Sequence, residues 1–289
     1  MDTEKHFNPE SSKKRGNYDD LKSLWRRFKA SQDNLHKQSS SSTVNKIRRK
    51  IFFDCLEEAE DKPGFFSLTV PTGGGKTRSG MGFALKHALE HNMDRIIVVI
   101  PYTSIIEQNT DVYRDIFGAK NVVEHHSSIS PERETERNRL FSENWDAPVI
   151  VTTTVQFFES LFASRPSRCR KLHNIANSVV ILDEVQTLPP KYIQSILDGL
   201  KQLVRHYETS VVFSTATQPA FQDRPNFPGV QGIREIVEEP ESLFSNLRRT
   251  TFHDRTNSPL STKEIVQELQ GHSTVLAILN TVSKAQEIF

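Results

Sequence analysis

Short apolar runs recur along the sequence, and the segments between them have apolar residues spaced three or four positions apart. The runs occupy residues 65–70, 96–100, 149–152, 179–182 and 211–213. The run 179–182 shows no polar alternation, which is typical of a strand buried on both faces of a parallel sheet. Helical spacing is found at residues 44–59, 81–89, 104–117 and 190–207, among others. This β-α alternation predicts an α/β fold, a doubly wound parallel sheet.

The alternation of apolar runs and helical segments is less regular after residue 217. Residues 218–250 contain four prolines and are interpreted as an irregular connector. We expect the following elements in addition: a charged helix at 131–141, a β-rich piece at 249–253, a helix at 262–270, a strand at 274–279 and the start of a helix at 282.

The first 43 residues are polar and end near four consecutive serines, so we interpret them as a flexible arm with a short helix near 21–28. The whole chain has a formal charge of +1, yet residues 11–50 hold 12 Lys/Arg and 3 Asp/Glu. A basic arm suggests attraction to polyanions, and a solvated linker is the alternative. The expected organisation is an arm at 1–43, a first domain at 44–248 and the start of a second at 249–289.

Cysteine content and hydropathy exclude several classes of protein. The two cysteines, Cys55 and Cys169, form neither a disulfide framework nor a metal-binding spacing, which favours a reducing cytoplasm. The sequence has no N-terminal apolar segment and no run of about 18 apolar residues. We therefore expect a cytoplasmic protein that is neither secreted nor membrane-spanning.

Residues 71–77, Pro-Thr-Gly-Gly-Gly-Lys-Thr, lie between an apolar run and a helical segment, as a phosphate-binding loop requires. Consecutive glycines let backbone N–H groups approach phosphate oxygens, and the helix N-terminus favours an anion. Lys76 is expected to contact the β- and γ-phosphates, and the Thr77 hydroxyl to hold Mg²⁺. The strict pattern requires Gly at position 70, where this chain has Val70. A glycine-rich turn that binds nothing is the alternative.

The candidate nucleotide-binding residues form one continuous stretch. They are Thr72, Gly73, Gly74, Gly75, Lys76, Thr77 and Arg78.

Two further runs end in polar residues suited to a phosphate site. Asp183 and Glu184 follow the run 179–182, at the strand end where open α/β sheets bind ligands. Asp183 is placed to contact Mg²⁺ and Glu184 to orient or deprotonate the attacking water, although acidic residues also end strands as turn formers or caps. Ser214, Thr215, Ala216 and Thr217 follow the run 211–213. The hydroxyls of Ser214, Thr215 and Thr217 are suited to coupling nucleotide state to domain position, or to ordinary capping of the next segment.

Together, Pro-Thr-Gly-Gly-Gly-Lys-Thr at 71–77, Asp-Glu-Val-Gln at 183–186 and Ser-Thr-Ala-Thr at 214–217 resemble superfamily 2 helicases. Residues 101–109, 124–128 and 151–157 resemble the DNA-contact motifs of that superfamily. Residues 183–190, 215–219 and 278–286 are similar to the CRISPR-associated helicase–nuclease of type I systems. The resemblance covers roughly residues 44–289.

The resemblance implies a RecA-like, ATP-driven motor that uses ATP and Mg²⁺. In that family the motor is recruited by a guide-RNA surveillance complex, moves 3′ to 5′ on single-stranded DNA and feeds it to a nuclease domain. Gln186 joins the residues at 214–217 as a candidate for coupling. The implied DNA-binding residues are Pro101, Tyr102, Thr103, His126, Ser127, Thr153, Thr154 and Gln156. For Tyr102, His125 and His126 plain packing is the alternative.

Two parts of the family pattern are missing from this sequence. The segment ahead of the loop is too short for the family's nuclease, and His253-Asp254 lacks a companion histidine cluster, so no nuclease is expected. The second RecA-like lobe is incomplete, and no late arginine motif closes the ATP site. We expect a fragment, a split gene product or a truncated form that binds ATP, hydrolyses it slowly and does not unwind DNA alone. A separate nuclease and a second helicase lobe are then possible partners.

The sequence leaves open how the base is recognised, which type of translocase this is and whether it unwinds DNA. No Gln shortly before the loop is available to read adenine, and Asn45 and Arg48 are the nearest polar candidates. Another superfamily 2 translocase, such as a restriction-type motor, is an alternative function. A nucleotide-dependent recruitment module without unwinding activity is another.

Overall fold

The computed structural model describes residues 17–127, 142–165, 169–217, 221–248, 250–257 and 259–289. The expected helix at 131–141 and the first 16 residues of the expected arm lie outside this set. The chain divides into two compact units, Met1–Leu247 and Arg248–Phe289.

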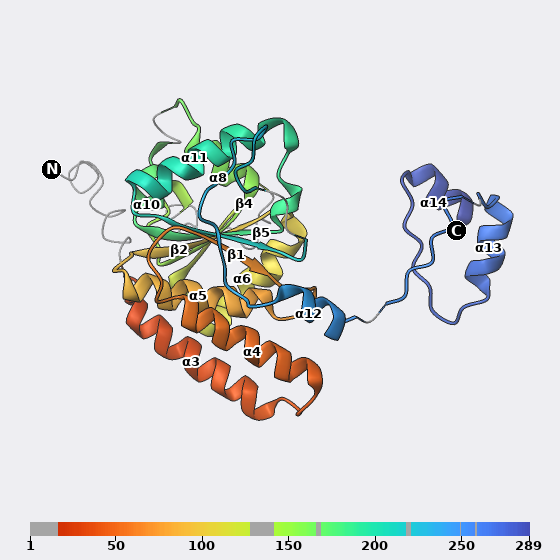
Figure 1. Cartoon of the computed structure of the whole chain (residues 1–289), viewed down its shortest axis with the longest axis horizontal. Helices are drawn as coiled ribbons and strands as arrows, with labels where there is room; N and C mark the ends of the chain where they lie inside the picture. The colour runs from red at the N-terminus through yellow and green to blue at the C-terminus, as the bar shows by residue number, and fades with distance from the viewer. Residues whose placement is uncertain (1–16, 128–141, 166–168, 218–220, 249, 258) are drawn as a thin grey trace. The chain divides into compact units, whose positions relative to one another are not determined.

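The first unit is built on one seven-stranded sheet in the order β3-β4-β2-β5-β6-β1-β7, in which every neighbouring pair is parallel (Figure 1). The strands are β1 (Phe65–Thr69), β2 (Arg95–Ile100), β3 (Val122–His125), β4 (Val149–Thr153), β5 (Ser178–Asp183), β6 (Ser210–Thr215) and β7 (Arg234–Glu235). The predicted doubly wound parallel α/β fold is confirmed.

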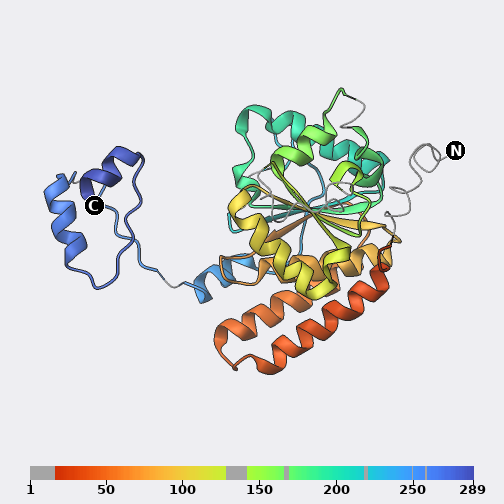
Figure 2. The same ribbon diagram turned by 180° about the vertical axis from the view of Figure 1, so that it is seen from behind.

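Helices cover both faces of the sheet, which explains why the strands are apolar at successive positions (Figures 1 and 2). Within β2, Ile96 and Val98 join one apolar core, and Ile97 and Val99 join the other. Helices α5 (Lys76–Glu90) and α6 (Thr103–Phe117) pack on the first face. The second face is covered by α8 (Thr154–Leu161), α10 (Leu172–Ile175) and α11 (Ile193–His206).

Two more helices, α3 (Leu21–Gln38) and α4 (Thr43–Glu58), lie against α5 and form an additional layer. On α3, Leu21, Leu24 and Phe28 are buried, and the Phe28 ring lies 6.2 Å from both Phe52 and Phe117. The short helix expected near 21–28 is present as the first part of α3, but the prediction of a flexible arm is wrong, because Leu21–Gln38 is one helix packed on the first unit. Its narrow apolar stripe, interrupted by Lys and Arg, needed a partner surface that local composition does not reveal.

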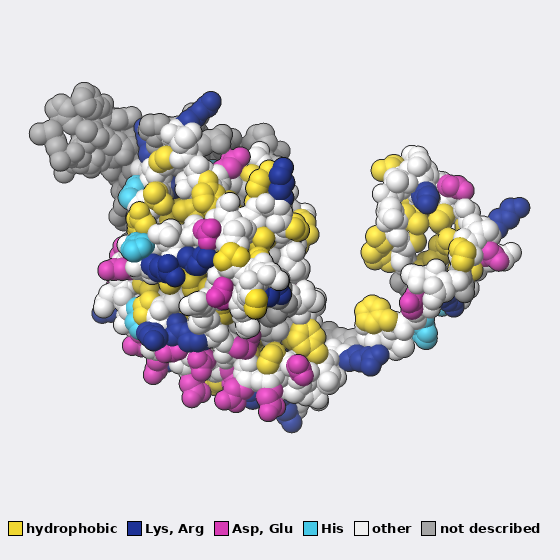
Figure 3. Space-filling model, turned by 45° about the horizontal axis from the view of Figure 1, so that its top comes forward, with side chains coloured by type: hydrophobic (Ala, Val, Ile, Leu, Met, Phe, Trp, Pro, Cys, Tyr) yellow, Lys and Arg dark blue, Asp and Glu magenta, His cyan; other side chains and the backbone are white. Residues whose placement is uncertain are grey.

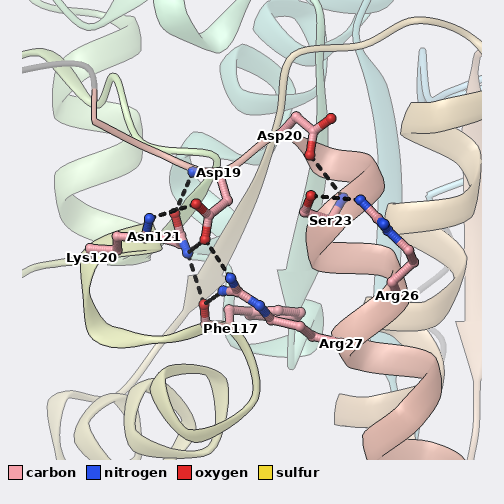
Figure 4. A network of polar contacts seen from close by, with 8 residues as sticks. All are labelled: Asp19, Asp20, Ser23, Arg26, Arg27, Phe117, Lys120 and Asn121. Carbon is pink, nitrogen blue, oxygen red and sulfur yellow. Dashed lines mark hydrogen bonds and ion pairs between the residues drawn. The ribbon is translucent and has the colours of Figure 1, made fainter.

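The start of α3 is tied to the rest of the first unit by polar contacts (Figure 4). The Asp20 carboxylate accepts a hydrogen bond from the Ser23 backbone N–H at 2.9 Å and caps the helix. Asp19 bridges Lys120, Asn121 and Arg27, and these contacts lower its pKa to about 2, the hydrogen bond from Lys120 contributing most. The contacts join α3 to the segment that follows α6.

The expected irregular connector contains two regular elements. β7 pairs with β1, and the Glu235 carboxylate accepts hydrogen bonds from Ser67 Oγ (2.7 Å), Thr69 Oγ1 (2.6 Å) and the Thr69 backbone N–H (3.0 Å). Helix α12 (Pro240–Asn246) follows. Strand β7 has two residues, too few for a periodic signal.

In the second unit the described residues form α13 (Thr262–Gln270) and α14 (Val282–Ile288) and no strand. The helix expected at 262–270 is confirmed, and it begins with a capping box of Ser261 and Glu264. The strands expected at 249–253 and 274–279 are wrong. Leu276 and Ile278 are 83% and 85% exposed, and no strand among the described residues of the unit supplies the hydrogen bonds that a strand requires. The assignment of this unit to a second RecA-like lobe stays a prediction.

The described surface of the first unit mixes Lys/Arg, Asp/Glu and apolar side chains on the face drawn in Figure 3. None of the described helices combines the length and the apolar composition needed to cross a membrane.

Phe28→Ala should destabilise the first unit by about 3–5 kcal/mol, because the ring is fully buried among other aromatic rings. Denaturant unfolding measures the loss, with the exposed neighbour variant Lys29→Ala as control. Equal stability of the two variants would show that α3 is not part of the core.

His87 makes the stability of the first unit depend on pH. Its ring is buried between the Ala59 carbonyl (2.9 Å) and Ser210 Oγ (2.8 Å), and burial lowers its pKa to about 4. Since the folded state favours the neutral ring, this contribution is present above the unfolded value of about 6.5 and is lost as pH falls from there through 4. Up to about 3 kcal/mol depends on this group.

Unfolding free energies measured between pH 6.5 and 4 should fall less steeply for His87→Asn than for the parent, while the exposed control His206→Asn should follow the parent. Parallel slopes for all three proteins would contradict the assignment.

Candidate nucleotide-binding site

The loop of residues 71–75 connects β1 to α5 and is shaped by its glycines. Gly73 and Gly75 have φ angles of 82° and 93°, which disfavour side chains. A Cβ on Gly74 would lie 2.5 Å from Val70 Cγ1 and 3.0 Å from the Pro71 carbonyl oxygen. Gly75 caps α5 without a side-chain hydrogen bond, so backbone N–H groups at the helix start can serve an anion.

Val70 occupies the place of the first glycine in the strict motif without disturbing the loop. Its backbone N–H donates to the Thr215 carbonyl oxygen at 3.1 Å, which continues the pairing of β1 with β6. Its side chain is buried and fills the space beneath Gly74. A glycine at position 70 is therefore unnecessary here, because the turn begins after this residue.

Lys76, the first residue of α5, forms an ion pair with Glu184, with Nζ 2.7 Å from Oε1. Both side chains are largely buried, with 12% and 29% of their surfaces exposed. Burial raises the pKa of Glu184, but the hydrogen bonds from Lys76 and Gln186 outweigh this and lower it overall. Glu184 is thus held ionised against the lysine.

Asp183 ends β5 and accepts a hydrogen bond from Ser214 Oγ at 2.9 Å. Burial raises its pKa, although Lys76 and Ser214 oppose the shift. A cation beside this carboxylate would favour its charged form.

Lys76, Thr77, Asp183, Ser214 and Tyr113 line one small cavity of about 10 Å³. The loop and the end of β5 therefore meet at one edge of the sheet. A Thr hydroxyl and a carboxylate supply the hard oxygen ligands that Mg²⁺ prefers, so this donor set fits the ion.

A chain of hydrogen bonds links Glu184 to the end of β6. Gln186 Nε2 donates to Glu184 Oε2 at 2.6 Å, and Thr215 Oγ1 donates to Gln186 Oε1 at 2.5 Å. The Thr217 backbone N–H donates to Thr215 Oγ1 at 2.9 Å, which holds the turn that contains Ala216. Three of the expected coupling residues, Gln186, Thr215 and Thr217, are thereby connected.

A second cavity, of about 90 Å³, lies beside Gly75 and is lined by residues of α3, α4 and α5. Within it Arg78 Nη1 donates to Gln32 Oε1 at 3.2 Å, and Arg48 Nε donates to the Gly73 carbonyl oxygen at 2.8 Å. Asn45 also lines it. Sequence reasoning missed Gln32, which occupies a buried position on the apolar side of α3, four residues after Phe28; that helical spacing was the available signal.

The expected DNA-binding residues follow the other half of the sheet. Strands β3, β4 and β2 are adjacent in the sheet order, and β5, β6 and β1 form the neighbouring group. Parallel pairing brings the motifs that follow all six strands to the same edge. Tyr102 is 52% exposed, which excludes plain packing, and Thr103 begins α6. The remaining positions on this edge are Pro101, Ser127, Thr154 and Gln156.

Two of the expected DNA contacts, His126 and Thr153, are buried instead. The His126 side chain is only 1% exposed, and Nε2 lies 2.9 Å from Glu124 Oε1, so the prediction of a direct DNA contact by this side chain is wrong. His125, in the same motif, is half-buried, receives a hydrogen bond from Trp145 and has its pKa lowered to about 3 by burial. The Thr153 hydroxyl caps α8 by accepting from the Gln156 backbone N–H at 3.2 Å.

A family model described as DEAD/DEAH box helicase matches residues 43–224. The chain belongs to the DEAD/DEAH box helicase family. The candidate nucleotide-binding residues and the expected DNA-contact residues all lie within the matched region.

Two curated relatives confirm the resemblance of this helicase to CRISPR-associated helicases. The CRISPR-associated nuclease/helicase Cas3 of Haloferax volcanii is 34% identical over 182 residues, 54% of this chain and 19% of the relative. The putative CRISPR-associated nuclease/helicase Cas3 of Methanocaldococcus jannaschii is 24% identical over 250 residues, 79% of this chain and 34% of the relative. The chain thus spans less than half the length of either relative.

Solved structures with partial likeness include the Hef helicase domain of Pyrococcus furiosus, with a TM-score of 0.46, 20% identity, and coverage of 71% of this chain and 40% of that one. T. fusca Cas3 with AMPPNP gives a TM-score of 0.47 at 19% identity, covering 58% and 21%. Likeness at this level carries no information on function.

Gly74→Ala should lower nucleotide affinity of this helicase at least tenfold, because the added methyl group would meet Val70 and the Pro71 carbonyl and displace the loop. Isothermal titration with ATP measures the effect, and Gly271→Ala in the second unit is the control. Unchanged affinity in Gly74→Ala would show that the loop does not contact the nucleotide.

Proposed function

We propose that this chain is the first RecA-like lobe of an ATP-dependent helicase or translocase of the CRISPR-associated type I family, acting on single-stranded DNA. The observation that supports it most is the convergence of Lys76, Thr77, Asp183 and Glu184 at one edge of the sheet. The exposed Tyr102 and the other motif residues of the DNA half follow neighbouring strands at the same edge.

The glycine loop and the start of α5 bind the triphosphate. Backbone N–H groups contact the phosphate oxygens, and Lys76 leaves Glu184 to contact the β- and γ-phosphates. Thr77 and Asp183 hold Mg²⁺, which neutralises charge on the phosphates when it is bound. The Lys76 contact requires the 2.7 Å ion pair to open, so nucleotide binding releases the Glu184 carboxylate.

Glu184, once released, orients the attacking water and accepts its proton. Its position is controlled by Gln186, which also accepts from Thr215. Loss of the γ-phosphate therefore alters the Gln186–Thr215 contact and the turn at Thr217. This chain of contacts couples the nucleotide state to the position of the partner lobe.

The cavity beside Gly75 receives the base. A Gln amide can donate to and accept from the edge of adenine, and Gln32 is held there by Arg78. Arg48 and Asn45 line the same cavity. These residues make ATP the nucleotide we propose.

DNA lies along the motifs that follow β2, β3 and β4. The Thr103 and Ser127 hydroxyls and the N-termini of α6 and α8 contact phosphates, and Tyr102 offers a ring for base stacking. A guide-RNA surveillance complex delivers the displaced strand.

Lys76→Ala should reduce ATP affinity more than tenfold, because the phosphates lose a fixed positive charge. The exposed Lys62→Ala is a charge-matched control and should bind ATP as the parent does. Titration calorimetry with ATP and Mg²⁺ distinguishes them, and equal affinities for the two variants would refute the proposed ATP site.

DNA-stimulated ATPase activity then separates a motor from a recruitment module. The assay is run on this chain alone and with a second RecA-like lobe added in trans. Stimulation in the second case supports the motor, and none in either case favours the module. Binding to a guide-RNA surveillance complex distinguishes the CRISPR type from a restriction-type translocase.

A further inference from the structure

Helices α3 and α4 present a concentration of positive charge to solvent. Residues 21–50, which span α3, the connecting turn and half of α4, contain nine Lys/Arg and a single acidic residue, Asp33. Because the apolar sides of both helices are buried in the first unit, their basic residues are held in fixed positions on its surface.

The charges follow the geometry of the helices. On α3, Lys22, Arg26, Lys29 and Lys37 recur at helical spacing along an exposed stripe, away from the buried Phe28. This stripe is about 22 Å long, at 1.5 Å of rise per residue. On α4 the basic residues exposed on the side opposite the buried Ile51 and Cys55 are Lys46, Arg49 and Lys50. The two rows together form the outer basic surface of the α3–α4 layer.

Most of these basic side chains form no ion pair with a described residue. Lys22, Lys37, Lys46 and Arg49 form no ion pair with any described residue, whereas Lys50 lies 3.0 Å from Asp54. Like charges along one helix repel each other and destabilise it slightly. The charge excess is therefore suited to a ligand rather than to packing.

We propose that the outer basic surface of the α3–α4 layer binds the phosphate backbone of nucleic acid. This goes beyond the proposed function, since the surface lies on the helical layer and not among the motifs at the carboxyl edge of the sheet. Lys side chains release counterions when they neutralise phosphates, which gives sequence-independent affinity with a steep dependence on salt. The contact holds nucleic acid beside the motor while nucleotide turnover proceeds at the edge.

An anionic membrane is a poorer match for this surface. An amphipathic helix that lies in a membrane buries its apolar side among the lipids, and here the apolar sides of α3 and α4 are enclosed in the protein core. Phe53 is an exception: it is 56% exposed on the same side of α4 as Lys46, Arg49 and Lys50. Its ring offers stacking to an unpaired base, which a duplex lacks.

The test uses the full chain and two charge-reversal variants at exposed positions, Lys22→Glu/Lys29→Glu on α3 and Lys37→Glu/Lys46→Glu near the turn. Fluorescence anisotropy measures binding of a single strand and of a duplex without sequence preference, from about 50 to 200 mM salt. Each double variant should weaken binding about tenfold at low salt and reduce the salt slope by about 1.4–1.8. Lys62→Glu/Arg205→Glu has the same change in charge on a different surface and should stay within twofold of the parent.

Further measurements distinguish the possible ligands of this surface. Phe53→Ala should weaken binding of the single strand but not of the duplex, if unpaired bases stack on the ring. If the variant and the parent bind the single strand with equal affinity, the surface contacts the phosphate backbone alone. Lys76→Ala should retain the salt-dependent binding, which separates this surface from the proposed ATP site. Parental binding and slope in both reversal variants, with folding intact by circular dichroism, would overturn the proposal. So would loss of binding to vesicles of anionic lipid without any loss for nucleic acid.

Discussion

Parallel pairing of the strands is the constraint on which the site depends. Strands that run in one direction bring all their carboxyl ends to one edge, whatever their separation in sequence. The pairing of Thr69 with Thr215 and of Asp183 with Ser214 places the loop after β1 next to the acidic end of β5 and the hydroxyl end of β6. Reversing the direction of β1 or of β5 alone would separate the lysine from the carboxylates.

The same constraint divides the edge into two halves. The strand order groups β5, β6 and β1 beneath the nucleotide residues and β3, β4 and β2 beneath the proposed DNA contacts. The halves meet where β2 pairs with β5, so Tyr102 and Asp183 lie at the ends of adjacent strands. The Lys76–Glu184 ion pair lies on the nucleotide side, and its exchange for a phosphate contact is the event that we propose to start coupling between the halves.

The sequence predicted the central strands and the glycine loop, because the strands are apolar on both faces and the loop has its own residue pattern. It did not predict the full extent of α3, whose stripe of Leu21, Leu24 and Phe28 is meaningful only against Phe52 and Phe117. The role of Gln32 was missed for the same reason. His126 illustrates the opposite failure, since a motif position implied exposure while Glu124 holds the ring inside. The segment at 274–279 has the apolar composition of a strand, but a strand also needs a neighbouring strand to supply its hydrogen bonds.

In the proposed site, Thr77 and Asp183 hold Mg²⁺ jointly beside the phosphates. The most direct measurement is the Mg²⁺ dependence of ATP affinity in Thr77→Ala and Asp183→Asn, compared with the parent. We predict that both variants lose most of the increase in affinity that Mg²⁺ gives the parent, while their affinity without Mg²⁺ stays close to that of the parent. Full retention of the Mg²⁺ effect in both variants would contradict the account.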